Sequence, residues 1–230
     1  MTLHPNGMHH IALMTSDIKQ QIEYFTDVLG ARLVGLYWMH GTEGAWHGFL
    51  ELSASSTVAF VQTPVVKDIE TSLDITHART PGHPCAAGTM QHFAMNVDSE
   101  DDLLAMRDRI RSRGIPCFGP VEHGMCTSIY FAGLEGLNLE VSTSNEAIDP
   151  QVWIDQEVVD LAGISAEELA RYKNPAAFDA ARGSVIQPVY DSAKPHMAYE
   201  PEAYKMMLAM PDEMLSAASN FSAPPANPAP

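Results

Sequence analysis

An internal repeat is the feature that most restricts the folds open to this chain. Residues 8–15 read MHHIALMT and residues 90–97 read MQHFAMNV, so each segment places a His before alternating apolar residues. Alternation with a period of two is typical of a β-strand. The histidines of the two segments, His10 and His92, stand 82 residues apart (92 − 10). We therefore expect two copies of one structural module.

The same order of elements follows both histidines. An amphipathic run comes next, IKQQIEYFTDVL in one copy and EDDLLAMRDRIRSR in the other, and it stops at Gly30 or Gly114. Apolar residues at helical spacing before a glycine predict a helix and its C-terminus. Strand-like segments complete the copies, WHGFLELS and TVAFVQT in the first, TSIYFAG and LNLEVST in the second. The sequence thus predicts an α+β domain over residues 1–145, with βαβββ modules at about 7–65 and 88–145.

The composition changes after residue 145. Short helical patterns, WIDQEVVDLAG, SAEELARY and EAYKMMLAM, predict a helical and irregular extension over residues 146–220. Ser165 and Glu168 stand at capping-box spacing. Residues 221–230, rich in Pro and Ala, are predicted to be disordered. As a hypothesis, the helices of the extension cover the mouth of a cleft or a dimer seam.

Charge and cysteine content exclude several classes of function. There are 29 acidic and 13 basic residues, giving a formal net charge of −16. Nucleic acid and anionic membrane surfaces are therefore not expected partners. The three cysteines form no CxxC pair, which favours a reducing compartment. Neither a signal peptide nor an apolar stretch of about 18 residues is found, and we expect a cytoplasmic protein.

The repeat also predicts a metal site. If the modules pack side by side, His10 and His92 converge on one cleft between them. Alternation in LNLEVST puts Glu140 on the face opposite Leu139 and Val141. The matching stretch of the first copy, residues 58–60, is apolar, which leaves three protein ligands. Two His and one carboxylate leave open positions on the metal, as non-haem Fe(II) sites require. Fe(II) is the expected metal, and Mn(II) or Zn(II) suits the same ligands.

These segments resemble the vicinal oxygen chelate superfamily, which includes glyoxalases, bleomycin-resistance and fosfomycin-resistance proteins, and type I extradiol dioxygenases. HHIALMTSD with the later YFTDVLGARLVG looks like the first module of that superfamily, and IYFAGLEGLNLEV looks like its last two strands. The resemblance covers roughly residues 7–145. It implies a half-open mixed β-barrel around the metal site. One departure is the connecting loop, Gly133 to Gly136, which usually reads like DPDG and here reads GLEG.

Within the superfamily the pattern is most similar to the extradiol branch, whose ligands would be His10, His92 and Glu140. That likeness implies catalytic roles for Tyr130, ten residues before Glu140, as a hydrogen-bond donor to substrate oxygen, and for His123 in proton transfer. A further His before the second module would be His77 or His83, and His77 is the one we assign. Phe60 and Phe93 are expected to contact the substrate. The resemblance implies a catechol-like aromatic substrate cleaved with O₂.

Three other functions compete with this interpretation. A glyoxalase-like isomerase or epimerase commonly has a fourth protein ligand, which the apolar residues 58–60 disfavour. A fosfomycin-type transferase would be expected to place an Arg soon after Glu140, and residues 141–150 contain no basic side chain. A non-enzymatic small-molecule-binding protein on this fold would typically lack the metal ligands. A homo-oligomer, a dimer or larger, is common for this fold and is expected.

Overall fold

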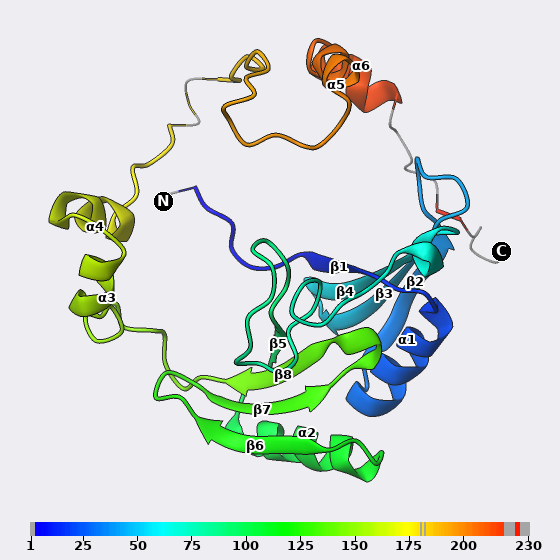
Figure 1. The fold of residues 1–230 in the computed structure, drawn as a ribbon, viewed down its shortest axis with the longest axis vertical. Coiled ribbons are helices and arrows are strands. Elements are labelled where there is room, and N and C mark those ends of the chain that lie inside the picture. Colours follow the sequence, from blue (N-terminus) through cyan, green and yellow to red (C-terminus); the bar gives the residue numbers. More distant parts are fainter. Residues whose placement is uncertain (1–2, 180, 182, 219–223, 226–230) are drawn as a thin grey trace. The chain divides into compact units, whose positions relative to one another are not determined.

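The computed structural model describes residues 3–179, 181, 183–218 and 224–225, and the first module forms one four-stranded sheet (Figure 1). Along this sheet the strands lie in the order β1-β4-β3-β2, with β1 parallel to β4 and the other pairs antiparallel. The elements of the module are β1 (His10–Met14), α1 (Ile18–Tyr24), the π-helical turn η1 (Phe25–Leu29), β2 (Arg32–Trp38), β3 (Trp46–Ser53), β4 (Ser56–Gln62) and the 3₁₀ turn η2 (Val66–Asp68).

The second module repeats this arrangement in a second sheet. Its strand order, β5-β8-β7-β6, matches that of the first module, and β5 is parallel to β8. Its elements are β5 (Phe93–Asn96), α2 (Glu100–Ser112), β6 (Cys117–Glu122), β7 (Thr127–Ala132), the 3₁₀ turn η3 (Leu134–Gly136) and β8 (Asn138–Thr143). Two open four-stranded mixed sheets with one helix each confirm the predicted pair of βαβββ modules.

Local sequence signals explain where both helices begin and end. The Asp17 side chain accepts a hydrogen bond from the backbone N–H of Gln20, and Ser99 caps α2 in the same way. At the other end, Gly30 and Gly114 have φ values of 79° and 77°, a left-handed conformation that suits glycine. The first helix departs from prediction in its last turn, which is π-helical from Phe25 to Leu29.

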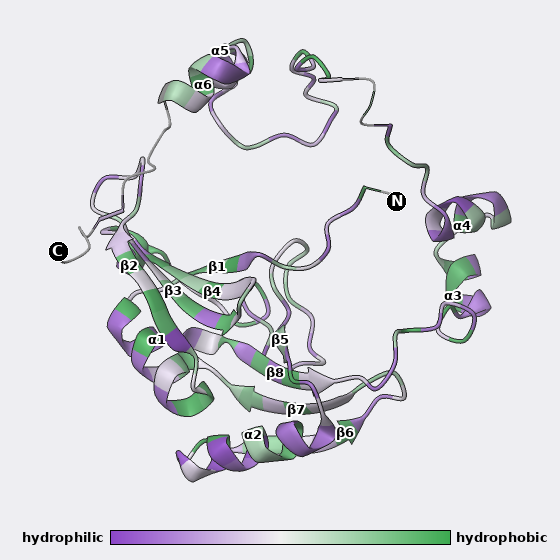
Figure 2. Cartoon of the chain, turned by 180° about the vertical axis from the view of Figure 1, so that it is seen from behind, coloured by the Kyte–Doolittle hydropathy of each residue, from purple (hydrophilic) through white to green (hydrophobic). Residues whose placement is uncertain are grey.

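Strand alternation divides each sheet into a core face and an outer face. In β8, Leu139 and Val141 belong to the hydrophobic core with exposed fractions of 0% and 2%. The same core takes in apolar side chains of α1 and α2, among them Phe25 and Leu103. Apolar and polar residues alternate around α2, which is visible as green and purple in Figure 2. One continuous core therefore serves both modules.

Hydrogen bonds also tie the first helix to the second module. The Tyr24 hydroxyl donates to the carbonyl oxygen of Ala132 over 2.5 Å. Two oxygens of the Glu135 carboxylate accept from Ser16 and Gln21: the Ser16 backbone N–H at 2.8 Å, the Ser16 hydroxyl at 2.5 Å and the Gln21 amide at 2.9 Å. Glu135 has a φ of 53°, in the left-handed region. The unusual GLEG turn thus places a carboxylate at the start of α1.

The chain after β8 divides between two compact units. One unit is residues 5–174 and includes α3 (Gln156–Leu161) and α4 (Ala166–Lys173). The other combines residues 1–4 with 175–230 and includes α5 (Pro201–Leu208) and α6 (Asp212–Ala218). The Ser165–Glu168 capping box is present at the start of α4.

The sequence boundary at residue 145 falls inside the larger unit, and all of the predicted disordered tail except residues 224–225 lies outside the described residues. Among the helices that the structure describes, none has the length and apolar character needed to cross a membrane.

Candidate functional site

Four of the predicted site residues lie in one chain of polar contacts on the second sheet. His92 Nε2 lies 3.0 Å from Glu140 Oε2. The other carboxylate oxygen of Glu140 accepts a hydrogen bond from the Tyr130 hydroxyl at 3.1 Å. That hydroxyl lies 2.8 Å from His123 Nε2. The two predicted second-module ligands and two predicted catalytic residues therefore meet at one place.

Strand register explains why these side chains meet. Tyr130 of β7 and Glu140 of β8 are direct cross-strand partners, and Ala94 of β5 is the partner of Glu140 on the other side. Directly paired residues point to the same face of a sheet. His92 precedes β5 and is two residues from Ala94, so alternation directs its ring to that face as well. His123 follows the end of β6.

Hydroxyl groups keep Glu140 ionised despite its burial. Its side chain is only 7% exposed, and burial by itself raises the pKa of a carboxyl group. Hydrogen bonds from Ser128, Ser142 and Tyr130, together with the charge of His92, more than offset this effect and leave the pKa of Glu140 below its ordinary value. The Ser142 hydroxyl donates to Glu140 at 2.7 Å. A carboxylate in this state has the charge that a divalent cation requires.

The same surroundings act on Tyr130 in the opposite direction. Burial raises the pKa of Tyr130, and the negative charge of Glu140 raises it further. Tyr130 therefore stays protonated near neutral pH and can act as a hydrogen-bond donor. The Tyr130 hydroxyl contacts both Glu140 and His123. If a ligand displaced one of these contacts, the other would still hold the hydroxyl in place.

The contact of Nδ1, the second ring nitrogen, fixes the orientation of the His92 ring. Nδ1 of His92 contacts the side-chain oxygen of Gln91. A hydrogen bond on Nδ1 fixes the tautomer that leaves Nε2 free to act as a metal ligand. The His92 side chain is 37% exposed, and its Nε2 faces the adjacent oxygen of Glu140.

His10, the predicted third ligand, has different neighbours. Its Nδ1 lies 2.8 Å from Nδ1 of His9, and its ring centroid lies 5.8 Å from that of Phe49. The ring of His47 lies 4.3 Å from Phe49, centroid to centroid. Burial lowers the pKa of His47, and the charge of His10 lowers it further. His10 therefore belongs to an aromatic group on the first sheet.

The side chains of this group therefore fit a metal ion only in part. The imidazole and carboxylate of His92 and Glu140 are the right donors, at a separation that one cation can bridge. Within the residues that the structure describes, however, no group of three or more His, Cys, Asp or Glu side chains is arranged to hold a metal. The contacts described for His10 are with His9 and Phe49, and none joins it to His92 or Glu140.

The first sheet supplies no carboxylate at the position equivalent to Glu140. Register makes Ala59 the partner of Ala12 in β1, just as Glu140 is the partner of Ala94 in β5. Ala59 is completely buried. The structure therefore agrees with the sequence argument that residues 58–60 provide no further ligand.

The remaining predicted site residues lie apart from this group. His77 Nδ1 lies 2.9 Å from the Thr76 hydroxyl, and its ring packs beside Gly136, just before β8. The alternative, His83, contacts the Thr80 hydroxyl at 3.2 Å. His77 is thus nearer to the strand that carries Glu140, but no direct contact joins it to the four-residue group.

The two phenylalanines assigned to substrate contact are core residues. Phe60 is 0% exposed and Phe93 is 5% exposed. The Phe60 ring lies 5.1 Å from that of Phe25, centroid to centroid. Each Phe is adjacent in sequence to a residue of the outer face, and strand alternation turns its side chain the other way. Neither ring reaches the face that carries Glu140 and Tyr130.

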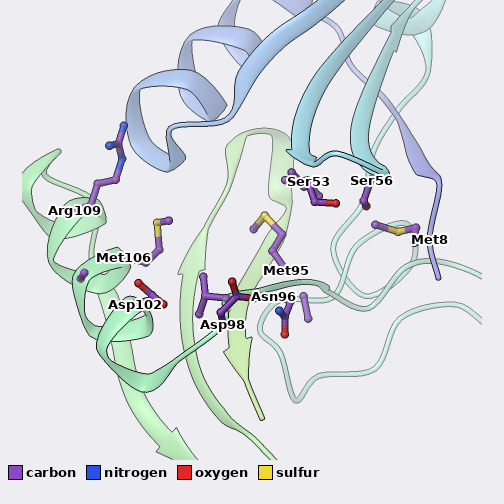
Figure 3. Close-up of a pocket in the computed structure, with 13 residues that line it drawn as sticks. Met8, Ser53, Ser56, Met95, Asn96, Asp98, Asp102, Met106 and Arg109 are labelled. Atoms are coloured by element: carbon purple, nitrogen blue, oxygen red, sulfur yellow. The ribbon is translucent and has the colours of Figure 1, made fainter. Parts of the chain in front are cut away.

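A cavity of about 910 Å³ borders the second sheet, and Ala94, the cross-strand partner of Glu140, is among its lining residues. It is bounded by α2, the end of β5 and the tip of the β3–β4 hairpin, with Met95 and Met106 facing its interior (Figure 3). Asp102 and Arg109 of α2 also line it. The predicted metal ligands and catalytic residues do not contribute to its walls.

Sequence reasoning missed the residues that support the site. Ser128 and Ser142 are cross-strand partners whose hydroxyl oxygens lie 2.9 Å apart. Both are two residues from a predicted site residue in the same strand, and that spacing was the available signal. Gln91 had no such signal beyond its adjacency to His92.

Comparisons with known proteins agree with the arrangement of modules. A family model described as the Glyoxalase/Bleomycin resistance protein/Dioxygenase superfamily matches residues 7–141. Biphenyl-2,3-diol 1,2-dioxygenase 2 of Rhodococcus globerulus is 29% identical over 139 residues, which are 59% of this chain and 62% of that protein. The chain therefore spans less than two thirds of the length of this relative.

Solved structures with similar modules were also found. A glyoxylase/bleomycin resistance protein/dioxygenase domain from Frankia sp. EAN1pec has a TM-score of 0.48 at 13% identity, covering 62% of this chain and 100% of that one. A fosfomycin resistance protein, FosX, from Listeria monocytogenes, complexed with Mn(II) and a sulfate ion, has a TM-score of 0.41 at 17% identity, covering 62% of this chain and 95% of that one. Because the family model matches more than half of the sequence, the chain belongs to the glyoxalase/bleomycin resistance protein/dioxygenase superfamily.

Proposed function

We propose that this protein is an Fe(II)-dependent extradiol-type dioxygenase that cleaves a catechol-like aromatic substrate with O₂. The observation that supports it best is the continuous contact from His92 through Glu140 and Tyr130 to His123. The group joins two metal-ligating side chains to a hydrogen-bond donor and a proton-transferring imidazole. The similarity to a biphenyl-diol dioxygenase also supports this class of reaction.

His92 and Glu140 would hold the metal, with His10 as the third ligand. When bound, ferrous iron would provide coordination positions for adjacent substrate oxygens and for O₂. The buried, ionised Glu140 offsets the cation's charge, and Ser142 keeps one of its oxygens in place. The apolar Ala59 on the first sheet stands at the register position where a fourth protein ligand would otherwise lie.

Tyr130 and His123 have complementary roles in the proposed reaction. Tyr130, kept protonated by its surroundings, donates a hydrogen bond to a substrate oxygen and so fixes the orientation of the ring. His123 Nε2 lies 2.8 Å from the Tyr130 hydroxyl. In the proposed reaction His123 accepts a proton from the substrate oxygen or returns one to it. A positioned acid–base group of this kind typically contributes about 10²- to 10⁴-fold to a rate.

The test combines metal content with oxygen consumption. Protein purified without oxygen should contain near-stoichiometric iron and consume O₂ when 2,3-dihydroxybiphenyl or catechol is added. His92→Ala and His10→Ala should each lose iron and consumption, whereas His196→Ala, in the other compact unit, should match the parent.

Other outcomes would identify a competing function. Bound metal without oxygen consumption would move the assignment to a glyoxalase-like isomerase or epimerase. A parent protein that holds no metal but binds an aromatic ligand would be a binding protein. Loss of iron in His92→Ala but not in His10→Ala would show that His10 keeps its place beside His9 and Phe49.

A further inference from the structure

The turn that carries His123 is covered by a residue from outside the two modules. Gly124 has a φ of +80°, and a Cβ atom at this position would lie 2.7 Å from Cη2 and 2.9 Å from Cζ2 of Trp153. Only a glycine allows the indole to lie this close to the backbone while the turn keeps its left-handed conformation. Trp153 therefore rests directly on the residue next to His123.

Hydrogen bonds define the backbone of this turn. The His123 N–H donates to the carbonyl oxygen of Cys126 at 2.9 Å. The Gly124 N–H donates to one oxygen of Glu122 at 2.8 Å, and the Thr127 hydroxyl donates to the other at 2.9 Å. These bonds set the shape of the turn. The His123 ring itself contacts the Tyr130 hydroxyl through Nε2, at 2.8 Å.

Hydrogen bonds to Asp149 also fix the segment that carries Trp153. The carbonyl oxygen of Asp149 accepts from the N–H groups of Val152 and Trp153 at 3.1 and 3.0 Å. The Asp149 carboxylate accepts from the Gln151 N–H at 2.8 Å. Trp153 is 43% exposed, so more than half of its surface is covered by the protein.

We propose that Trp153 is a positioning residue of the candidate site, which holds the 123–126 turn so that His123 stays in contact with Tyr130. This inference rests on the proposed function for its catalytic consequence. The family match ends at residue 141, so the residue comes from the part of the chain that follows the shared modules. It gives the segment after β8 a role at the reaction centre.

Loss of the indole should reduce the rate rather than the affinity for substrate. A displacement of about 1 Å in a proton-transferring group can lower a rate about 100-fold. We expect Trp153→Ala to lower kcat about 10- to 100-fold with little change in KM and unchanged iron content. Trp153→Phe, which keeps a flat ring, should recover most of the rate. The matched control is Tyr172→Ala, an exposed aromatic of α4 in the same unit.

A readout that does not depend on turnover keeps the test decisive. Nitrogen chemical shifts of the His123 ring, assigned with a His123→Gln variant, report its hydrogen bond to Tyr130. In Trp153→Ala they should move towards those of an exposed histidine, as in Tyr130→Phe, and in Trp153→Phe they should stay near the parent values. If Trp153→Ala fails to fold, Trp153→Leu takes its place.

The outcomes separate this inference from the proposed function. Unchanged His123 shifts in the folded Trp153 variant would overturn the positioning role, even if the parent consumes O₂. Changed shifts in a parent that neither binds iron nor consumes O₂ would uphold the positioning role and reject the dioxygenase. A fall in kcat that Trp153→Phe does not relieve, with unchanged shifts, would also count against it.

Discussion

Replacing Glu135 should weaken the contact between the two modules at the start of α1 and so lower the stability of the fold. In the native turn the carboxylate accepts hydrogen bonds from the backbone and hydroxyl of Ser16 and from the amide of Gln21. The contact to the Ser16 N–H resembles a helix cap, whose loss costs about 1 kcal/mol. The bond from Gln21 contributes about another 1 kcal/mol. We therefore expect Glu135→Ala to lose about 2 kcal/mol of unfolding free energy, with nothing added for the bond from the Ser16 hydroxyl because the side chain is exposed to solvent.

The pH dependence supplies a second, independent check. Burial raises the pKa of Glu135, but the bonds from Ser16, Thr15 and Gln21 outweigh it and lower the pKa below the ordinary value of 4.5. A carboxyl group with a depressed folded-state pKa stabilises the fold above its unfolded-state pKa. That stabilisation is lost as the pH falls through the lower, folded-state pKa. The difference between the parent and Glu135→Gln should therefore shrink below about pH 4.5.

Urea unfolding and thermal melts, both followed by circular dichroism, measure the loss of stability and its dependence on pH. At neutral pH, Glu135→Ala should shift the thermal midpoint down by about 4 to 8 °C, and Glu135→Gln, which keeps one acceptor oxygen, by about half of that. The matched control is Glu146→Gln, an exposed carboxylate beyond β8. A Glu135→Ala protein within about 0.5 kcal/mol of the parent would refute the reasoning. So would a difference from the parent that grows as the pH falls.

Three further predictions concern the site and the contact between modules. His123→Gln should lower kcat at least about 100-fold with unchanged iron content, measured by oxygen uptake and metal analysis. Adding Mn(II) at 100 times its Kd should stabilise the parent by about 2.7 kcal/mol in a thermal melt, and His92→Ala should show no such gain. Arg109→Met should cost about 1 to 2 kcal/mol in urea unfolding, because the guanidinium donates to the carbonyl oxygens of Asp27 and Val28 at 2.9 Å each. Unchanged stability in Arg109→Met would mean that water replaces these bonds at no cost.

The modules were predictable because their signals are local and occur twice. Polar and apolar residues alternate from Asn138 to Ser142, and glycines follow the helices at Gly30 and Gly114, so pattern alone located these elements. The ten-residue separation of Tyr130 and Glu140 was noted only as a likeness to the extradiol branch, and the structure shows that the two residues are cross-strand partners. Such a separation leaves little freedom in the register of two strands.

The parts that escaped prediction depend on how distant segments pack. The residues next to Phe60 and Phe93 do not show which face of each strand is the core, because both faces contain apolar residues. Alternation assigns the two Phe side chains to a face only when the face of Ala59 or His92 is already known. His10 depends on the placement of one whole module against the other. Trp153 contacts Gly124 across 29 residues (153 − 124), and no periodic signal marks such a contact.

The two sheets differ at the positions where their registers correspond, and the difference has consequences for their divergence. The pair Tyr130–Glu140 in the second sheet corresponds to Phe49–Ala59 in the first. Two residues further along, Ser128–Ser142 corresponds to His47–Val61. One copy therefore has both the acid and the hydroxyl groups that support it, and the other has neither.

A single mutation cannot restore the missing half. A glutamate at Ala59 would enter a fully buried position directly opposite the apolar Phe49, and a buried carboxylate with too few hydrogen-bond donors is strongly destabilising. The hydroxyl groups of Tyr130 and Ser142 have the apolar Phe49 and Val61 as their counterparts, so further substitutions would be needed to support the acid. The specialisation of the duplicated modules is thus protected from reversal by the polar groups around the acid, more than by the acid itself.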